Sequence, residues 1–346
     1  MHEEPLRPEG PPRARPPRPP GPLVGIVPET PSPAWKVCLL TSVVASALVR
    51  LGVSGLEHYG YMLFMGVPLI IGFVTAHLYQ KGRDPILWRT VGVVVLTAFL
   101  VWLFLMVPPL EGLVCMAMAA GLALPFIILG VLIAMWIRKR NERAARQGIA
   151  GNLHSFVILL VPAGMLAESR VALPPPLLEQ TTSIEINATP EQVWRYIPAF
   201  PRIESTPTKL LGMGIAYPLE STITGEGIGA KRQCVLSTGT MPEVITAWEP
   251  GRRLEFDVLA TPTAMEETSP FGKVQAAHDN GYFICKHGRF VLTPLPGGRT
   301  RVEGTSWFQH DLWPQFYWAP LTKEVVHEVH ERVLQHVKAL AEKEGH

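Results

Sequence analysis

Residues 91–107 of the chain read VGVVVLTAFLVWLFLMV, a run without a single charged side chain. A transmembrane α-helix needs roughly 20 predominantly apolar residues to cross the hydrocarbon core of a bilayer. This run lies within an apolar stretch over about 90–107, where we therefore predict a membrane-spanning helix. The composition agrees, because only 17% of the 346 residues are charged, against about 25% in soluble globular domains.

Further apolar stretches flank this one on both sides. Residues 59–79 carry a tyrosine at each end, where an interfacial aromatic belt is expected, and residues 112–137 end next to Trp136. With 90–107 they predict three membrane-spanning helices.

Two shorter apolar stretches contain residues that are unusual in a membrane-spanning helix. Residues 37–53 predict a further span with Arg50 near its far end, where the guanidinium must reach the interface or face other helices. Residues 151–167 contain Pro162 and fit a short span, a re-entrant piece or an interfacial helix. The expected architecture over 35–169 is therefore a bundle of four to five helices.

Basic residues alternate between the predicted loops. No Lys or Arg lies in 108–111, whereas the loops after 59–79 and after 112–137 hold Lys81, Arg83, Arg89, Arg138, Lys139, Arg140, Arg143 and Arg146. Basic loops favour the cytoplasm, so we expect a multi-pass protein of the cell (inner) membrane. Its C-terminal domain lies outside the cytoplasm if 151–167 spans. Because few ionisable groups lie inside the spans, an anchoring or partner-binding role fits them better than a transport path, and a pore between protomers stays open.

The rest of the composition indicates a disordered tail and a linker, and it argues against several kinds of partner. The Pro-rich residues 1–34 predict a disordered tail, and three prolines mark a linker over 170–180 before a soluble domain over 181–344. The four cysteines are scattered, the net charge is +2 and no basic stripe is present. We therefore expect no metal site, no cofactor and no nucleic-acid partner.

The soluble domain has an α+β pattern. TTSIEIN at 181–187 alternates as a strand does, and Thr189 and Pro190 suit the N-cap and first position of a helix. Residues 321–343 carry valines at helical spacing and predict a long amphipathic helix. Between them, strand-like runs separated by Gly- and Pro-rich turns cover about 218–225, 230–239, 242–249, 252–259, 280–294 and 299–309.

Three motifs of this domain resemble those of a known superfamily: IEINATPEQVWRYIPAFP at 184–201, VITAWEPGRRLEFDV at 244–258 and FVLTPLPGGRTRVEGT at 290–305. Over about 180–343 the sequence is similar to the START-like (SRPBCC, polyketide cyclase/dehydrase and lipid transport) superfamily. Its fusion to a multi-pass region resembles a group of bacterial membrane proteins.

The resemblance implies a helix-grip fold, in which a seven-stranded antiparallel sheet around a long C-terminal helix encloses an apolar cavity. Members of the superfamily bind lipids, sterols or polyketides, and some catalyse cyclisation or dehydration. The stretch 260–279 departs from the pattern, either as a lid over the cavity mouth or as a solvated excursion.

The implied cavity would be lined by the inward strand faces and the last helix. The candidate ligand-binding residues come from these elements and from the aromatic-rich segment 307–318: Trp248, Phe256, Tyr282, Phe290, His310, Trp313, Tyr317 and His330. Phe256 and Phe290 also fit an ordinary core, and the segment 307–318 also fits a membrane interface or an aromatic plug that closes the sheet. His310 and His330 are the candidates for proton transfer. The adjacency of His310 and Asp311 is no evidence of a dyad, because neighbours on an extended chain point opposite ways.

These patterns favour a membrane-anchored binding protein for a hydrophobic or amphipathic, lipid-like small molecule. The alternatives are a cyclase/dehydrase-type enzyme that uses His310 or His330, and a membrane interaction or sensor protein. A cavity that is apolar throughout would favour the binding protein. A buried histidine that faces a substrate-sized cavity would favour the enzyme, and a cavity filled by its own side chains would favour the interaction or sensor protein.

Overall fold

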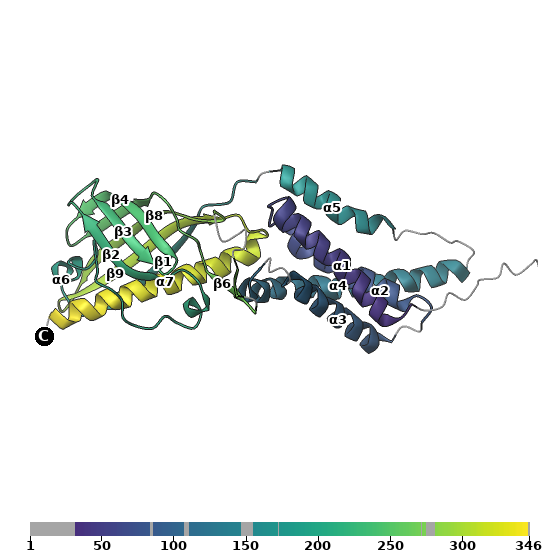
Figure 1. The fold of residues 1–346 in the computed structure, drawn as a ribbon. Coiled ribbons are helices and arrows are strands. Elements are labelled where there is room, and N and C mark those ends of the chain that lie inside the picture. Colours follow the sequence, from purple (N-terminus) through teal and green to yellow (C-terminus); the bar gives the residue numbers. More distant parts are fainter. Residues whose placement is uncertain are drawn as a thin grey trace, which may run out of the picture.

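The computed structural model describes residues 32–83, 86–106, 111–146, 155–171, 173–270, 272–274 and 281–344. The molecule is elongated, with the helices of the N-terminal half at one end and a β-sheet domain at the other (Figure 1). We call residues 34–170 the helical region and residues 178–344 the β domain. The predicted tail over 1–34 lies almost wholly outside the described residues.

Among the described residues, four helices are long and apolar enough to cross a membrane, namely Ala34–Gly55, Met62–Gln80, Leu87–Leu105 and Leu113–Glu142. They overlap the four predicted stretches at 37–53, 59–79, 90–107 and 112–137. Their parts are α1 (Ala34–Arg50) with the π-helical turn η1 (Leu51–Gly55), η2 (Met62–Gly66) with α2 (Val67–Gln80), α3 (Leu87–Leu105) and α4 (Leu113–Arg146).

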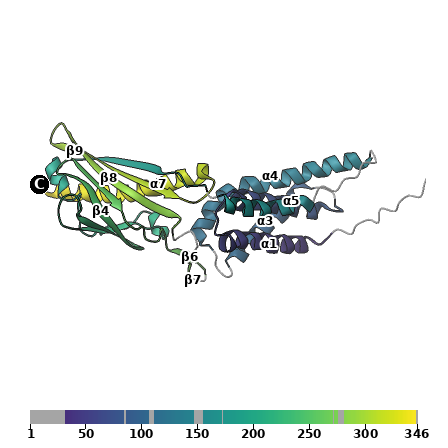
Figure 2. The same ribbon diagram turned by 90° about the horizontal axis from the view of Figure 1, so that it is seen from above.

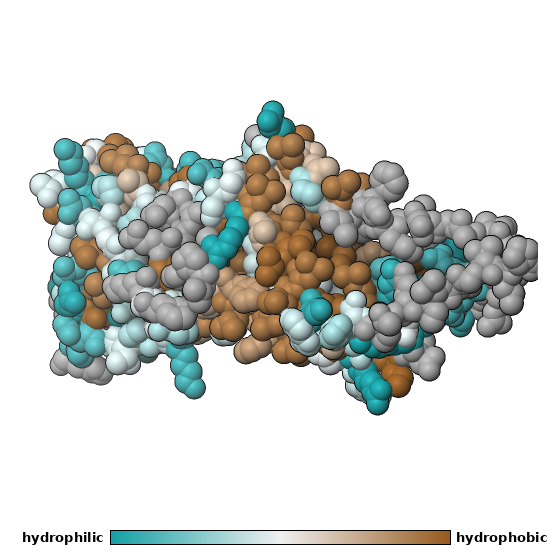
Figure 3. All heavy atoms as spheres, turned by 45° about the vertical axis from the view of Figure 1, so that its right-hand side comes forward, coloured by the Kyte–Doolittle hydropathy of each residue, from teal (hydrophilic) through white to brown (hydrophobic). Residues whose placement is uncertain are grey.

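Large apolar side chains cover the outside of these helices. Examples from α1, α3 and α4 are Leu40, Val95, Phe99, Ile128 and Leu132, all exposed. Figure 3 shows apolar residues gathered over the helical region next to the more polar β domain. A monomeric soluble protein rarely presents so wide an apolar patch, so this surface suits contact with a bilayer.

The predicted fifth stretch forms α5 (Ser155–Arg170), which runs beside the other helices and packs against η2 and α2 (Figures 1 and 2). Its 16 residues rise by only about 24 Å, short of the roughly 30 Å hydrocarbon core. Near its end, the Glu168 carboxylate accepts a hydrogen bond from the backbone N–H of Met62 at 3.0 Å. Residues 151–154 of the predicted stretch lie outside the described residues.

The backbones of α2 and α4 approach closely through two glycines. A Cβ added at Gly72 would collide with the carbonyl oxygen of Ile127, and one at Gly130 would collide with that of Leu69. Such small-residue contacts are typical of helix packing in lipid, where close van der Waals contact holds helices together.

The β domain contains a seven-stranded antiparallel sheet, as predicted. Its strands are β1 (Leu178–Ile186), β2 (Pro218–Thr224), β3 (Lys231–Leu236), β4 (Gly239–Glu249), β5 (Arg253–Val258), β8 (Phe283–Leu295) and β9 (Arg299–His310). The spatial order is β1-β9-β8-β5-β4-β3-β2, and the curled sheet wraps the C-terminal helix α7 (Gln315–Glu344) (Figures 1 and 2).

Helix α7 begins six residues before the predicted start at Leu321, and Pro320 lies within it. A proline inside a helix removes a backbone hydrogen bond. Here the first turns are held by packing instead, because Tyr317 and Trp318 contact the helical region. The sequence pattern could not reveal those contacts.

The stretch 260–279 is not a simple loop. Its described part forms a small hairpin of β6 (Glu267–Ser269) and β7 (Gly272–Val274), and β6 lies against α4. Just before it, Met265 packs with Ile215 and with Val114 of α4. Residues 271 and 275–280 lie outside the described residues.

Two buried clusters fill the two ends of the β domain. At the end far from the helical region, α6 (Pro190–Trp194) starts after Thr189 as predicted, and the Thr189 N–H donates to Oε1 of Gln192 at 2.9 Å. This end is packed with Ile186, Val193, Ile197, Leu254, Val302 and Leu334. At the near end, residues of α4 join Ile215, Met265 and Leu211, which opens the short 3₁₀ helix η3 (Leu211–Met213).

Candidate ligand cavity

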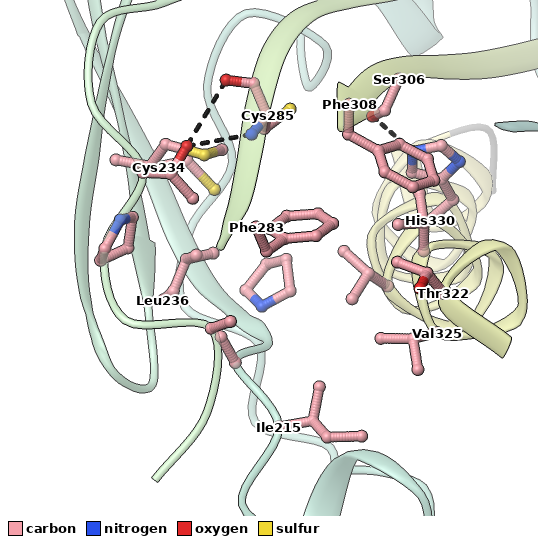
Figure 4. Close-up of a pocket in the computed structure, with 18 of the residues that line it drawn as sticks. Ile215, Cys234, Leu236, Phe283, Cys285, Ser306, Phe308, Thr322, Val325 and His330 are labelled. Carbon is pink, nitrogen blue, oxygen red and sulfur yellow. Dashed lines mark hydrogen bonds between the residues drawn. The ribbon is translucent and has the colours of Figure 1, made fainter. Parts of the chain in front are cut away.

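A cavity of about 260 Å³ lies between the sheet and α7. Its wall takes residues from both clusters, including Phe256 and Val333 from the far one and Ile215 and Met265 from the near one. Figure 4 shows Phe283 and Phe308 of the sheet and Val325 of α7 pointing into the same space. The lining is mostly aliphatic, aromatic and sulfur-containing, so the cavity suits a hydrophobic ligand.

Two glycines make room for the aromatic walls. A Cβ at Gly288 would collide with the ring of Phe256, and one at Gly304 would lie 3.4 Å from the ring of Phe290. Both glycines oppose these rings across neighbouring strands of the sheet. The absence of a side chain at each glycine therefore gives the opposing ring room to pack over the neighbouring strand.

The end of the cavity toward the helical region is lined by α4. Val114, Cys115 and Met118 from the start of that helix complete the wall. The β domain alone therefore does not enclose its cavity.

A buried ion pair lies in the wall between β3 and β4. Arg232 Nη1 pairs with Glu243 Oε2, and the two side chains are 3% and 1% exposed. Arg232 Nε also donates to the carbonyl oxygen of Pro198 at 2.9 Å, and its guanidinium lies over the Phe256 ring. Burial raises the pKa of the Glu243 carboxyl, and the neighbouring Arg232 opposes that rise. Glu243 Oε1 has no hydrogen-bond partner among the described residues.

Two cysteines line the same wall, Cys234 on β3 and Cys285 on β8. Burial raises the pKa of each thiol to about 12. Since the thiolate is the nucleophile, neither cysteine is poised for covalent catalysis.

His330 on α7 is tied into the sheet rather than free. Its Nε2 lies 2.7 Å from the Ser306 hydroxyl and its Nδ1 lies 3.3 Å from the Thr182 hydroxyl. Thr182 in turn contacts Nδ1 of His327 at 2.8 Å. Burial, and then the nearby His327, lowers the pKa of His330 to about 4. Its imidazole is therefore neutral near pH 7 and serves a structural network at the cavity wall.

His310 at the end of β9 is different. It is 2% exposed, its Nδ1 accepts the N–H of Leu312 at 3.4 Å, and its Nε2 has no partner among the described residues. Burial lowers its pKa to about 4, which Asp311 only partly offsets. Since Nδ1 accepts, Nε2 carries the proton in this arrangement. His310 thus brings an unpaired N–H donor to the cavity wall.

The structure places five of the eight predicted ligand-binding residues on the cavity wall, namely Phe256, Tyr282, Phe290, His310 and His330. The other three lie elsewhere. Trp248 packs edge-on against Trp194 at the far end, with ring centroids 5.5 Å apart. Trp313 packs on Tyr61, and the Tyr317 hydroxyl donates to the carbonyl oxygen of Met118 at 2.5 Å.

The aromatic segment 307–318 forms the junction between the two halves of the molecule. The Trp313 N–H donates to the carbonyl oxygen of Tyr59 at 2.9 Å. From the neighbouring β8 side, the Tyr282 hydroxyl donates to the carbonyl oxygen of Glu57 at 2.6 Å.

Sequence reasoning missed Arg232 and Glu243 in the wall. The signal was present, because Arg232 and Cys234 alternate on β3 as Glu243 and Ile245 do on β4, so the charged residues share the inward face. The α4 contribution carried no such signal. Within the described residues, no group of three His, Cys, Asp or Glu side chains is placed to hold a metal ion.

Residues 178–342 match the sequence profile of the family described as polyketide cyclase / dehydrase and lipid transport. The β domain is thus a polyketide cyclase/dehydrase-type (SRPBCC-like) domain, which is a ligand-binding fold.

Similar solved structures include XoxI from Bacillus cereus, at 16% identity and a TM-score of 0.32, over 49% of this chain and 98% of that one. A protein from Nitrosospira multiformis is 19% identical, with a TM-score of 0.30 over 47% of this chain and 94% of that one. A protein from Thermus thermophilus is 15% identical, with a TM-score of 0.31 over 49% of this chain and 100% of that one. No curated protein matches the sequence.

Proposed function

We propose that this protein is a membrane-anchored binding protein that holds a lipid-like molecule in the cavity of its β domain. The observation that carries the proposal is the apolar cavity of about 260 Å³ whose end is lined by α4. Each CH₂ group moved from water to such a wall contributes about 0.8 kcal/mol. A hydrocarbon chain therefore gains more from this cavity than a small polar molecule does.

The ion pair supports a ligand that is neutral but carries a hydrogen-bond donor. Arg232 and Glu243 neutralise each other, so a charged ligand group would find no free countercharge there. Glu243 Oε1 is an unpaired acceptor on the wall, among the described residues. A hydroxyl or amide N–H of the ligand would satisfy it.

The test is to purify the full chain in detergent, extract it with organic solvent and identify the bound molecule by mass spectrometry. Val325→Phe fills the cavity, because Val325 points into it (Figure 4). The matched control is Glu324→Phe at the exposed neighbouring position. We expect Val325→Phe to lower the bound amount at least about tenfold and Glu324→Phe to leave it unchanged. Equal amounts in both variants, or no bound molecule in the unmodified chain, would refute the proposal.

His310 favours one second candidate, an enzyme of the cyclase/dehydrase type. Its buried imidazole brings to the cavity an N–H that is unpaired within the described part of the chain, where it can pass a proton to or from a ligand. The same extraction decides between the two functions. A dehydrase with His310→Gln would retain a molecule heavier by one water than that held by the unmodified chain, whereas a binding protein would retain the same molecule.

The arrangement of charges supports a β domain outside the cytoplasm. Lys81 and Arg83 follow α2, and Arg138 and Lys139 lie toward the end of α4. The β domain contacts the opposite ends of these helices, near Glu57, Tyr59 and Val114. Because basic loops face the cytoplasm, we place the β domain on the other side of the inner membrane. This placement requires the segment that contains α5 to cross the membrane again, and the contact of Glu168 with Met62 puts the end of α5 on the β-domain side.

A further inference from the structure

A second cavity, of about 250 Å³, lies inside the helical region. Its wall takes residues from all four long helices, for example Val53, Ile71, Val101 and Ala123. Beside them lies one polar pair, in which the Tyr59 hydroxyl donates to Glu111 Oε1 at 2.6 Å. The lining is otherwise almost entirely apolar.

This second cavity faces the surface that suits a bilayer. Among the described residues, the closely packed pairs of long helices are α1 with α3, α2 with α4, and α2 with both α1 and α3, whereas α3 and α4 are not closely packed. Both helices nevertheless line the cavity, through Val101 and Trp102 on one side and Ala120 and Leu124 on the other. Leu124 is 55% exposed on the outside of the bundle. The cavity wall thus includes a side chain on the outside of the bundle at this part of the α3–α4 seam, whereas Val94 and Val131 share a buried cluster elsewhere along it. We take the part beside Leu124 as the opening to lipid.

The two cavities meet at a thin partition. Cys115, Leu312 and Trp318 line both of them. Trp318 is 4% exposed, its ring packs on Phe64 with centroids 5.1 Å apart, and its Nε1 has no partner among the described residues. A single indole, held by packing rather than by a hydrogen bond, thus forms a large part of the barrier.

The volumes also suggest that the cavities belong together. Ligand pockets commonly measure about 300–1,000 Å³, and each cavity alone falls just below that range. Joined, they fall within it.

We infer that the hydrocarbon chain of a bilayer lipid passes through the α3–α4 seam into the helical cavity and reaches the β domain past Trp318. The inference rests on the proposed binding function and adds the source of the ligand and its route. Trp318 acts as a gate, because rotation of its side chain joins the two cavities.

The test uses the full chain in phosphatidylethanolamine/phosphatidylglycerol vesicles. The probe is a monoacylglycerol, which is neutral and carries free hydroxyls, with a mid-chain diazirine and a terminal alkyne on its acyl chain, supplied in donor vesicles. Samples are irradiated at successive times, and labelled peptides are mapped by mass spectrometry. We expect label on 113–127 first and on the cavity wall at 325–333 later.

Three variants separate the route from the site. Ala123→Phe blocks the helical cavity and should slow labelling of 325–333 about tenfold. Ala117→Phe, an exposed position on the same helix that lines neither cavity, should leave the rate unchanged. Trp318→Ala removes the partition and should speed labelling of 325–333 several-fold, with 113–127 still labelled first.

The outcomes distinguish the two proposals. If 325–333 is labelled at the same rate in Ala123→Phe and Trp318→Ala as in the unmodified chain, the route is wrong and the binding function stands. If 325–333 is never labelled in the unmodified chain, the cavity does not take a hydrocarbon chain and both proposals fail.

Discussion

The Tyr317 hydroxyl donates a hydrogen bond to the carbonyl oxygen of Met118 at 2.5 Å, which joins the first turn of α7 to α4. The same hydroxyl oxygen would be the nearest neighbour of a Cβ added at Gly121, at 2.6 Å. Helix α7, which lines one side of the ligand cavity, is therefore hydrogen-bonded to the helical region.

Tyr317→Phe removes this hydrogen bond and keeps the ring. A typical intramolecular hydrogen bond contributes about 0.5–1.5 kcal/mol, so hydrogen exchange of the backbone at 315–320 should speed about 2- to 12-fold. The matched control is Tyr61→Phe, since the Tyr61 hydroxyl has no hydrogen-bond partner among the described residues while its ring packs on Trp313. Equal exchange in the two variants would show that the bond does not hold α7.

Glu243→Leu should destabilise the β domain strongly. It leaves the Arg232 charge buried without its partner, and breaking a buried ion pair costs roughly 3–5 kcal/mol. The double variant Arg232→Met, Glu243→Leu should recover most of that loss in thermal unfolding. Glu185→Gln, at a largely exposed ion pair with Arg299, should cost less than about 1 kcal/mol. A double variant as unstable as Glu243→Leu would mean that the lost charge balance is not the cause.

Stability should fall as the pH drops from about 6.5 to about 4. The pKa of both His310 and His330 is lowered by burial to about 4, whereas in the unfolded chain it is about 6.5. Between these values the unfolded chain binds more protons, so the stabilisation is complete above pH 6.5 and is lost toward pH 4. His330→Gln should flatten the pH dependence of the free energy of unfolding, removing on the order of 3 kcal/mol of its change over this window. The unfolding temperature should then vary less with pH. An unchanged slope would contradict a neutral, buried His330.

Gly130→Ala should loosen the pair of helices α2 and α4. Its new methyl group would meet the carbonyl oxygen of Leu69, and overpacking of this kind costs about 1–3 kcal/mol. Gly92→Ala is the matched control, since a Cβ there meets nothing within 4 Å among the described residues. Thermal unfolding in detergent should separate the two variants, and equal melting curves would argue against close packing at Gly130.

Alkaline phosphatase fusions should report the side of the β domain. The enzyme is active only outside the bacterial cytoplasm, where its disulfides form. A fusion after residue 346 should be active, and one after residue 141 inactive. The reverse pattern would place the β domain in the cytoplasm.

Much of the fold could be predicted because its signals are local. Apolar runs of the right length marked α1 to α4, and period-two alternation between Gly- and Pro-rich turns marked the strands. The start of α7 was misplaced because Pro320 is a local helix-breaking signal, whereas the contacts of Tyr317 and Trp318 that overcome it join residues far apart in sequence.

The cavity wall was predicted less completely for the same reason. Alternation is enough to place Phe256 and Phe290 on the inward face. Trp313 and Tyr317 have the aromatic character of ligand-binding residues, yet they contact Tyr61 and Met118 of the helical region. Whether such an aromatic residue lines the cavity or contacts the helical region depends on how the two halves of the molecule pack together. That packing leaves no periodic pattern in the sequence.

The lining of the cavity mouth by Val114, Cys115 and Met118 has a thermodynamic consequence. A lipid-like ligand partitions almost wholly into the bilayer, so its aqueous concentration is negligible and does not set how often the site is filled. Occupancy instead follows the mole fraction of that molecule among the surrounding lipids. Diluting the protein-bearing membranes with buffer would leave the site as full as before, whereas fusing them with ligand-free vesicles would empty it.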